Sequence, residues 1–209
     1  MANGYERIYE SLVTRLRTCD FPEVAQRLGL TLRADGALAV GFLGREYEIS
    51  HQGVNPTDDE PVSVNNRSVI AYYALSSGAG EPAFSYVPLS SLAGTAVIAN
   101  ANTNWMTDRL GKAFSGDYGG FCEAMRRLGG IYDGKLESGG YSWLLRALPK
   151  IPVQIVYYGR DDDFPCEVQI RFDQNAARFL EFECLAFLQG CLVRAMVMTA
   201  QTGGTAGWA

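Results

Sequence analysis

The densest group of ionisable side chains is the acidic turn Gly159–Pro165, in which Asp161, Asp162 and Asp163 follow one another between two apolar runs. Carboxylate oxygens bind hard divalent cations, but calcium loops alternate their ligands and include a glycine, a spacing that this turn lacks. Consecutive side chains also point in different directions, so we expect no metal site here. We interpret the turn as a solvated hairpin tip whose like charges prevent two apolar strands from pairing with neighbouring molecules.

An alternative interpretation gives these carboxylates an enzymatic role. A carboxylate of the acidic turn, or Asp173, would exchange a proton with a substrate, and Tyr157 or Tyr158 would serve as the proton donor. This hypothesis of a carboxylate-dependent enzyme requires the groups to converge in a cleft. The sequence has no phosphate-binding loop, dinucleotide fingerprint, nucleophile elbow or paired-histidine metal helix that would name another reaction.

The histidine and cysteine residues limit nucleophilic and redox chemistry. His51 is the single histidine and precedes a loop that contains glycine and proline, so we interpret it as a loop or strand-end residue. Cys184 and Cys191 lie ~10 Å apart along a helix, too far for one disulfide or one metal ion. We expect Cys166 to lie nearest the surface, where a redox or soft-metal role stays open. The five scattered cysteines favour reduced thiols: Cys19, Cys122, Cys166, Cys184 and Cys191.

Aromatic residues offer a binding site rather than a catalytic one. Eleven tyrosines, three tryptophans and ten phenylalanines are enough to line an apolar pocket with polar atoms at its rim. Core packing is the alternative for each of them taken singly. The ligand-binding candidates are Tyr72, Tyr73, Trp105, Trp143, Tyr157 and Tyr158. The sequence does not identify the cofactor or other ligand that such a pocket would accept.

Composition and charge exclude several classes of partner. The net charge of −5 and the absence of a lysine- and arginine-rich cluster argue against nucleic acid, because phosphate binding needs clustered cations. No window approaches the ~20 apolar residues of a membrane span, and the N-terminus lacks an export signal. We therefore expect a cytoplasmic protein that binds neither a membrane nor nucleic acid.

Hydrophobic periodicity predicts an α+β fold in one domain over residues 1–200, followed by a flexible glycine-rich tail over residues 201–209. An N-terminal meander within 30–49 and a C-terminal hairpin over 151–173 form an antiparallel sheet. Several helices pack against it, including a long C-terminal helix over 175–198. Residues 51–64 and 133–140 are predicted loops. Because the last helix is apolar around most of its circumference, a homodimer built on it is a third functional hypothesis.

Several phrases resemble an uncharacterised prokaryotic family catalogued as domain of unknown function 3786. The phrases are Pro152-Val153, the turn Gly159–Pro165, Phe172–Ala176, the stretch Ile70–Leu75 and the linker Gly80–Pro82 with Phe84–Leu92. The resemblance covers about Tyr5 to Met198 and implies an accessory protein of anaerobic metabolism. Some members are fused to a cysteine-rich iron–sulfur domain, whose cysteine cluster this chain lacks. The family supplies no catalytic residues, so we expect a small-molecule or cofactor site lined by aromatic residues.

Overall fold

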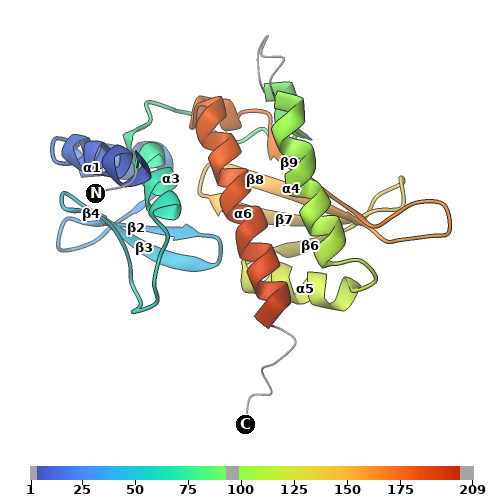
Figure 1. The fold of residues 1–209 in the computed structure, drawn as a ribbon. Helices are drawn as coiled ribbons and strands as arrows, with labels where there is room; N and C mark the ends of the chain where they lie inside the picture. The colour runs from blue at the N-terminus through green and yellow to red at the C-terminus, as the bar shows by residue number, and fades with distance from the viewer. Residues whose placement is uncertain (1–3, 93–98, 203–209) are drawn as a thin grey trace.

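A computed structural model describes residues 4–92 and 99–202, and the side chains of residues 99–105 and 201–202 lie outside that description. The fold is α+β, with two antiparallel sheets that lie side by side and are covered by helices (Figure 1). This confirms the predicted fold class. The meander and the C-terminal hairpin, however, belong to different sheets.

The first sheet has the strand order β1-β2-β3-β4. Its strands are β1 (Thr31–Leu32), β2 (Leu38–Phe42), β3 (Arg45–Ser50) and β4 (Gly53–Pro56). The helices of this half are α1 (Gly4–Leu16), α2 (Phe21–Leu28) and α3 (Val64–Leu75). Helices α1 and α3 pack on each other and on β4, which lies inside the predicted loop 51–64. That loop prediction is wrong for β4, because a four-residue edge strand with a proline carries little periodicity.

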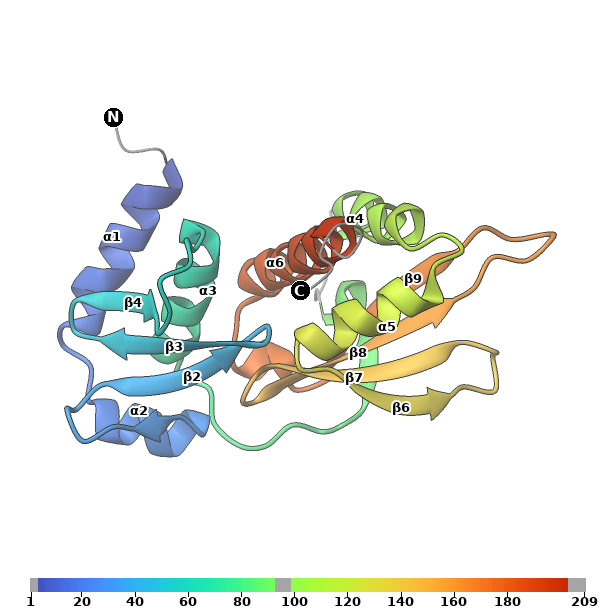
Figure 2. The same ribbon diagram turned by 90° about the horizontal axis from the view of Figure 1, so that it is seen from below.

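The second sheet has the strand order β5-β9-β8-β7-β6. Its strands are β5 (Tyr86–Pro88), β6 (Ile131–Lys135), β7 (Tyr141–Leu148), β8 (Ile151–Tyr158) and β9 (Glu167–Asp173). Helices α4, α5 and α6 lie on one side of it (Figure 2). These helices are α4 (Ala99–Ala113), α5 (Tyr118–Arg127) and α6 (Phe182–Thr202), and the short 3-10 helices are η1 (Leu89–Leu92) and η2 (Ala176–Arg178).

Helix α6 begins at Phe182, so the predicted start near Asn175 is wrong. The buried carboxylate of Asp173 accepts the backbone N–H of Asn175 at 2.8 Å, and with it those of Ala83 at 3.0 Å and Phe84 at 2.6 Å. These bonds fix a turn that leads into η2 and delay the helix. At the other end, Gln201 and Thr202 of the predicted tail are helical, and residues 203–209 lie outside the described residues.

The segment Phe182–Ala200 of α6 is long and apolar enough to cross a membrane by length and composition, and is the one such helix among the described residues, so the expectation that no window approaches a membrane span is wrong by this criterion. Its buried residues include Leu185, Leu188 and Leu192, which pack in the hydrophobic core. A core helix meets the same criterion, and 39% of this segment is buried, so packing accounts for part of its apolar composition.

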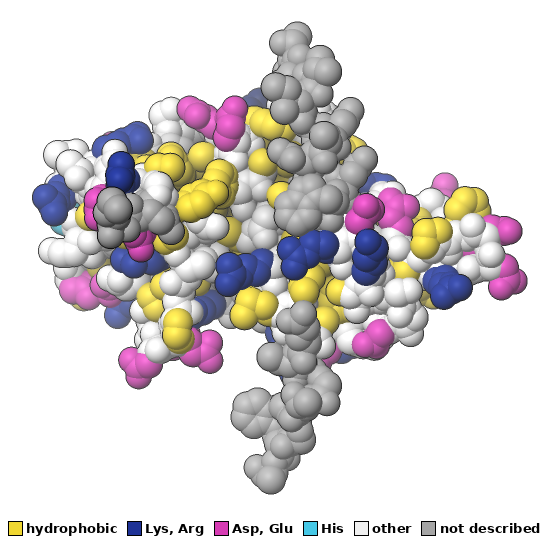
Figure 3. Space-filling view, viewed as in Figure 1, with side chains coloured by type: hydrophobic (Ala, Val, Ile, Leu, Met, Phe, Trp, Pro, Cys, Tyr) yellow, Lys and Arg dark blue, Asp and Glu magenta, His cyan; other side chains and the backbone are white. Residues whose placement is uncertain are grey.

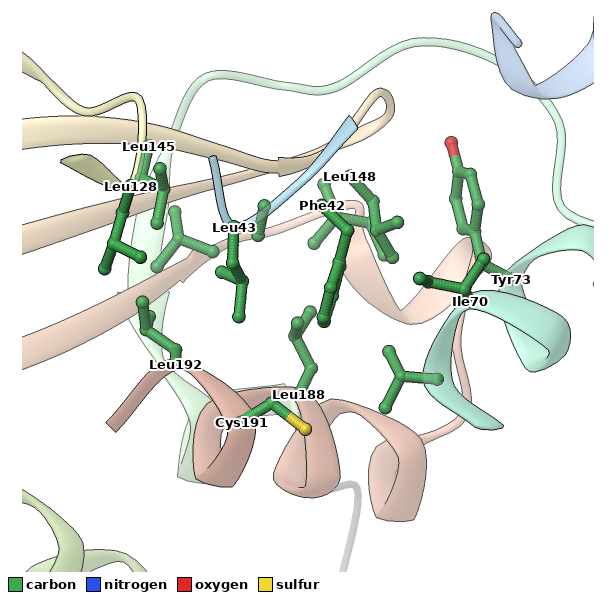
Figure 4. Packing of buried hydrophobic residues seen from close by; sticks show 14 of the residues in the cluster. Phe42, Leu43, Ile70, Tyr73, Leu128, Leu145, Leu148, Leu188, Cys191 and Leu192 are labelled. Carbon is green, nitrogen blue, oxygen red and sulfur yellow. The ribbon is translucent and has the colours of Figure 1, made fainter. Parts of the chain in front are cut away.

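Leu43 joins the two halves of the molecule. It occupies the β2–β3 turn at φ 50°, a left-handed conformation, and Gly44 follows at φ 76°. The Leu43 side chain is buried and lies among Leu128, Leu145 and Leu192 of the second half (Figure 4). Buried residues of both halves form a single cluster. The prediction of one domain over residues 1–200 stays a prediction.

Candidate functional site

An open groove lies between α5 and the β6–β7 edge of the second sheet, with a volume of about 420 Å³. We call it the aromatic groove. Its lining residues are Tyr118, Cys122, Arg126, Gly130, Tyr132 and Trp143.

Two simple periodicities place these side chains together. Tyr118, Cys122 and Arg126 are spaced four residues apart on α5, so they fall on one stripe of the helix. Tyr132 of β6 is the direct cross-strand partner of Trp143 of β7, so both side chains lie on the same face of the sheet. The helix stripe and the cross-strand pair form the two walls of the groove.

The two ends of α5 are fixed by local interactions. At the start, the Asp117 carboxylate accepts the N–H of Gly120 at 2.7 Å and caps the helix. At the end, the N–H of Gly130 bonds the Met125 carbonyl at 2.7 Å. A Cβ on Gly130 would lie 2.9 Å from the Met125 carbonyl oxygen, a backbone atom, so the close return of the chain to β6 favours glycine here.

The aromatic rings continue beneath the groove. Tyr118 lies 4.6 Å from Tyr141 and 5.1 Å from Tyr157, measured between ring centroids. Trp143 meets Tyr132 at 5.6 Å and Phe121 at 6.3 Å, both edge to face. Such geometries are favourable for aromatic pairs, so the rings hold one another in place.

Trp143 has a buried polar atom without a regular hydrogen bond in the described part of the chain. The side chain is 4% exposed, and its Nε1–H makes no hydrogen bond of regular geometry with any described residue, although it lies near enough to the Tyr118 hydroxyl to lower the pKa of that group. Leaving a buried donor unpaired costs about 1–3 kcal/mol, so such a group calls for an explanation. A ligand that offers an acceptor in the groove would satisfy it.

The charges at the groove favour an electron-rich ligand. The Arg126 guanidinium lies 5.9 Å from the centroid of Trp143 and makes a long, exposed ion pair of 3.9 Å with Glu123. Burial raises the pKa of Tyr118 to about 12, with the Trp143 N–H acting in the opposite sense and Cys122 adding to the rise. The Tyr118 hydroxyl therefore stays protonated near neutral pH and can donate a hydrogen bond.

The structure brings together two of the six aromatic residues proposed from the sequence. Trp143 lines the groove, and buried Tyr157 lies beneath it with its hydroxyl donating to the Phe114 carbonyl at 3.1 Å. Tyr158 lies apart, where its hydroxyl pairs with that of Ser138 at 3.0 Å. The side chain of Trp105 lies outside the described residues.

Tyr72 and Tyr73 belong to α3 in the first half of the molecule, away from the groove. Tyr73 is fully buried, and its hydroxyl donates to the Leu28 carbonyl at 2.9 Å while accepting the Lys150 N–H at 3.0 Å. Burial raises its pKa. These two hydrogen bonds link Leu28 of the first half to Lys150 of the second half through the Tyr73 hydroxyl.

The acidic turn projects from the β8–β9 hairpin into solvent, as Figure 1 shows at its right edge. Asp161 Oδ1 accepts the N–H groups of Asp163 at 3.0 Å and Phe164 at 2.7 Å, which shapes the tip. All three aspartates are exposed, and Asp173 is buried at the opposite end of β9. The carboxylates of the enzyme hypothesis do not converge in a cleft. In the described part of the chain, no group of three His, Cys, Asp or Glu residues could hold a metal ion.

His51 and Cys166 are structural. The His51 Nδ1 lies 2.9 Å from the Leu16 carbonyl, which assigns the proton to that nitrogen, and its ring stacks on Phe21 at 4.3 Å. Cys166 is buried, so the expectation that it lies near the surface is wrong. Its thiol faces the Phe114 carbonyl at 3.8 Å, and burial raises its pKa, which disfavours a reactive thiolate.

Sequence reasoning missed five lining residues: Tyr118, Cys122, Arg126, Gly130 and Tyr132. The four-residue spacing of Tyr118, Cys122 and Arg126 was an available signal for the first three, because it places them on one face of a helix. Tyr132 directly precedes the predicted loop over 133–140, so no pattern in the sequence indicated that Tyr132 pairs with Trp143. Strand β6 extends into that stretch as far as Lys135, and the loop prediction is wrong there.

Comparison with known proteins gives one match. A family model described as a domain of unknown function (DUF3786) matches residues 20–195. No curated protein and no solved structure matches the chain.

Proposed function

Because the chain belongs to the domain of unknown function 3786 family, whose description names no activity, we propose a function from the geometry of the aromatic groove. The protein is a non-catalytic binding protein that accepts a planar small molecule or cofactor between α5 and the β6–β7 pair. It would serve as an accessory protein in the cytoplasm of an anaerobic prokaryote, the setting that the family resemblance implies.

The observation that carries this proposal is the buried N–H of Trp143, which makes no regular hydrogen bond with the described residues. This N–H is already removed from water and interacts with the Tyr118 hydroxyl without a regular hydrogen bond, so a ligand acceptor that reaches it gains a bond without a new desolvation penalty on the protein side. The rings of Tyr132 and Tyr118 offer stacking surfaces beside it. The groove volume lies within the usual range of ~300–1,000 Å³ for small-molecule sites.

The test begins with a thermal-shift screen of compounds that are planar and carry acceptors: nucleotides, flavin mononucleotide, a tetrapyrrole and a corrinoid. The affinity of each hit is then measured by calorimetry for the wild type and for Tyr132→Ala. We expect this substitution to weaken binding about 5- to 100-fold, because it removes one stacking face worth ~1–3 kcal/mol.

Tyr5→Ala is the matched control, because Tyr5 and Tyr132 are both 49% exposed but Tyr5 lies on α1. It should leave the affinity unchanged. A flat response to the whole panel, or equal losses in the two variants, would count against the proposal.

A second candidate function is self-association through α6. Exposed Phe187 and Met198 lie on α6, and Phe187 meets Tyr5 of α1 edge to face at 6.0 Å between ring centroids. Hydrophobic side chains gather on this face of the molecule between α1 and α6 (Figure 3). Light scattering tests the idea: a dimer that becomes a monomer in Phe187→Asp supports it, and a monomeric wild type at micromolar concentration removes it.

A further inference from the structure

A second groove, with a volume of about 340 Å³, lies where the β2–β3 hairpin meets the second sheet. We call it the junction groove. Strand β6 pairs only with the first half of β7, so the outer edge of β7 from Leu145 onward faces the hairpin instead. The lining residues are Gly41, Gly44, Arg45, Leu128, Gly129, Arg146 and Pro149.

The charges that line the junction groove are both positive, although the chain as a whole carries −5. Arg146 is exposed on β7 and has no ion-pair or hydrogen-bond partner among the described residues. Its guanidinium is therefore free to bind an anion. Glu46 is the cross-strand partner of Gly41 but does not line the groove.

Arg45 is a second, pre-positioned cation. Its Nε donates to Asp58 Oδ2 at 2.8 Å, its Nη2 donates to the other oxygen of the same carboxylate and to the Glu60 carbonyl, and its Nη1 reaches the Pro61 carbonyl at 3.3 Å. The long Arg45 side chain is thereby held in one orientation. Asp58 offsets part of its charge, so Arg146 is the principal anion-binding group.

Packing within the protein does not explain why position 41 is a glycine. It lies within β2, where glycine weakens a strand, yet its φ is not positive. A Cβ built on Gly41 would meet no protein atom within 4 Å. By contrast, Gly44 has a positive φ, and its Cβ would lie 2.2 Å from the Arg127 carbonyl oxygen. Glycine inside a strand commonly marks the close approach of a ligand or another backbone.

We propose that the junction groove binds the anionic oxygen group, phosphate or carboxylate, of a small molecule. Arg146 forms the bidentate contact for which a guanidinium is suited, and Arg45 contributes a second positive charge. The absent side chain of Gly41 leaves room for the ligand. This site is independent of the aromatic groove, although both are lined by residues of the α5–β6 connection, Leu128 and Gly129 on one and Gly130 on the other.

The test is isothermal titration calorimetry at low ionic strength with pyrophosphate in one arm and citrate in the other. The arm that gives saturable binding identifies the preferred oxyanion. Arg146→Gln should weaken that binding about 10- to 100-fold, the usual effect of removing a charge-assisted bidentate contact. The exposed and unpartnered state of Arg146 predicts that this variant unfolds at the wild-type temperature.

Two further variants separate the site from general charge attraction. Arg160→Gln removes the same charge from the exposed tip of the β8–β9 hairpin and should leave the affinity within about two-fold. Gly41→Phe should abolish binding by filling the groove, while Gly41→Ala should retain it. The proposal is overturned if neither anion binds, if Arg146→Gln binds as the wild type does, or if Arg160→Gln weakens binding equally.

Discussion

The strained turn at Leu43 gives the sharpest test of how the two halves of the fold are joined. Its side chain is 8% exposed and lies among Leu128, Leu145 and Leu192, so Leu43→Ala leaves a cavity between the meander and the second sheet. Substitutions of this kind destabilise proteins by about 2–5 kcal/mol. The backbone at φ 50° adds a second effect, because the left-handed region costs a residue with a Cβ about 1–2 kcal/mol.

The two effects predict an unusual order of stabilities. Alanine at position 43 loses the packing and keeps the strain, whereas glycine loses the packing and relieves the strain. Leu43→Gly should therefore be at least as stable as Leu43→Ala, although glycine is ordinarily less stable than alanine by about 0.5–1 kcal/mol within regular structure. Both variants should lie about 2–4 kcal/mol below the wild type.

Urea unfolding followed by circular dichroism and tryptophan fluorescence measures these free energies. Leu32→Ala is the control, because Leu32 is 43% exposed on β1 and its loss should change stability by no more than about 0.5 kcal/mol. A Leu43→Gly variant less stable than Leu43→Ala by a full kilocalorie, or a Leu43→Ala variant as stable as the wild type, would refute the reasoning.

Two other outcomes follow from buried ionisable groups. Asp173→Asn should destabilise the protein by about 2–4 kcal/mol, because the buried carboxylate accepts three backbone N–H groups, while exposed Asp162→Asn should change thermal unfolding by less than about 0.5 kcal/mol. Burial raises the pKa of Cys191 from 9.0 to about 12 and that of Cys184 to about 11, so their thiols ionise in the unfolded chain before they do in the folded one. The free energy of unfolding should therefore stay constant from neutral pH to about 9 and fall between pH 9 and 12. In Cys191→Ala the fall should be smaller. An equal fall in Cys191→Ala and in the wild type would contradict this assignment.

Long and continuous patterns were predictable from the sequence. Strand β8 is a nearly continuous apolar run, β9 alternates apolar and polar residues, and the core face of α6 repeats apolar residues over many turns, so each signal is strong by itself. Short elements were not predictable, because the few residues of β4 and β6 contain proline or glycine and show no clear alternation. The start of α6 depends on Asp173 binding distant backbone N–H groups, a tertiary effect that local propensity does not contain.

The candidate sites depended still more on tertiary structure. The sequence identified Trp143 as a candidate by residue type alone, but its place in the aromatic groove depends on Tyr132 lying opposite it on the neighbouring strand. The junction groove unites residues of β2, β3, β7 and the end of α5, which are far apart in the chain. The one feature of the sequence that pointed to this groove was Gly41, a glycine inside a strand whose other residues are larger.

The state of the Trp143 indole N–H tests the proposed binding function most directly. Protein labelled with ¹⁵N at tryptophan gives indole signals from its three tryptophans, and the signal missing in Trp143→Phe belongs to Trp143. On titration with a ligand from the thermal-shift screen, that resonance should move downfield and saturate as the N–H gains an acceptor. If the ligand binds while the Trp143 indole resonance stays where it was, the aromatic groove is not the binding site.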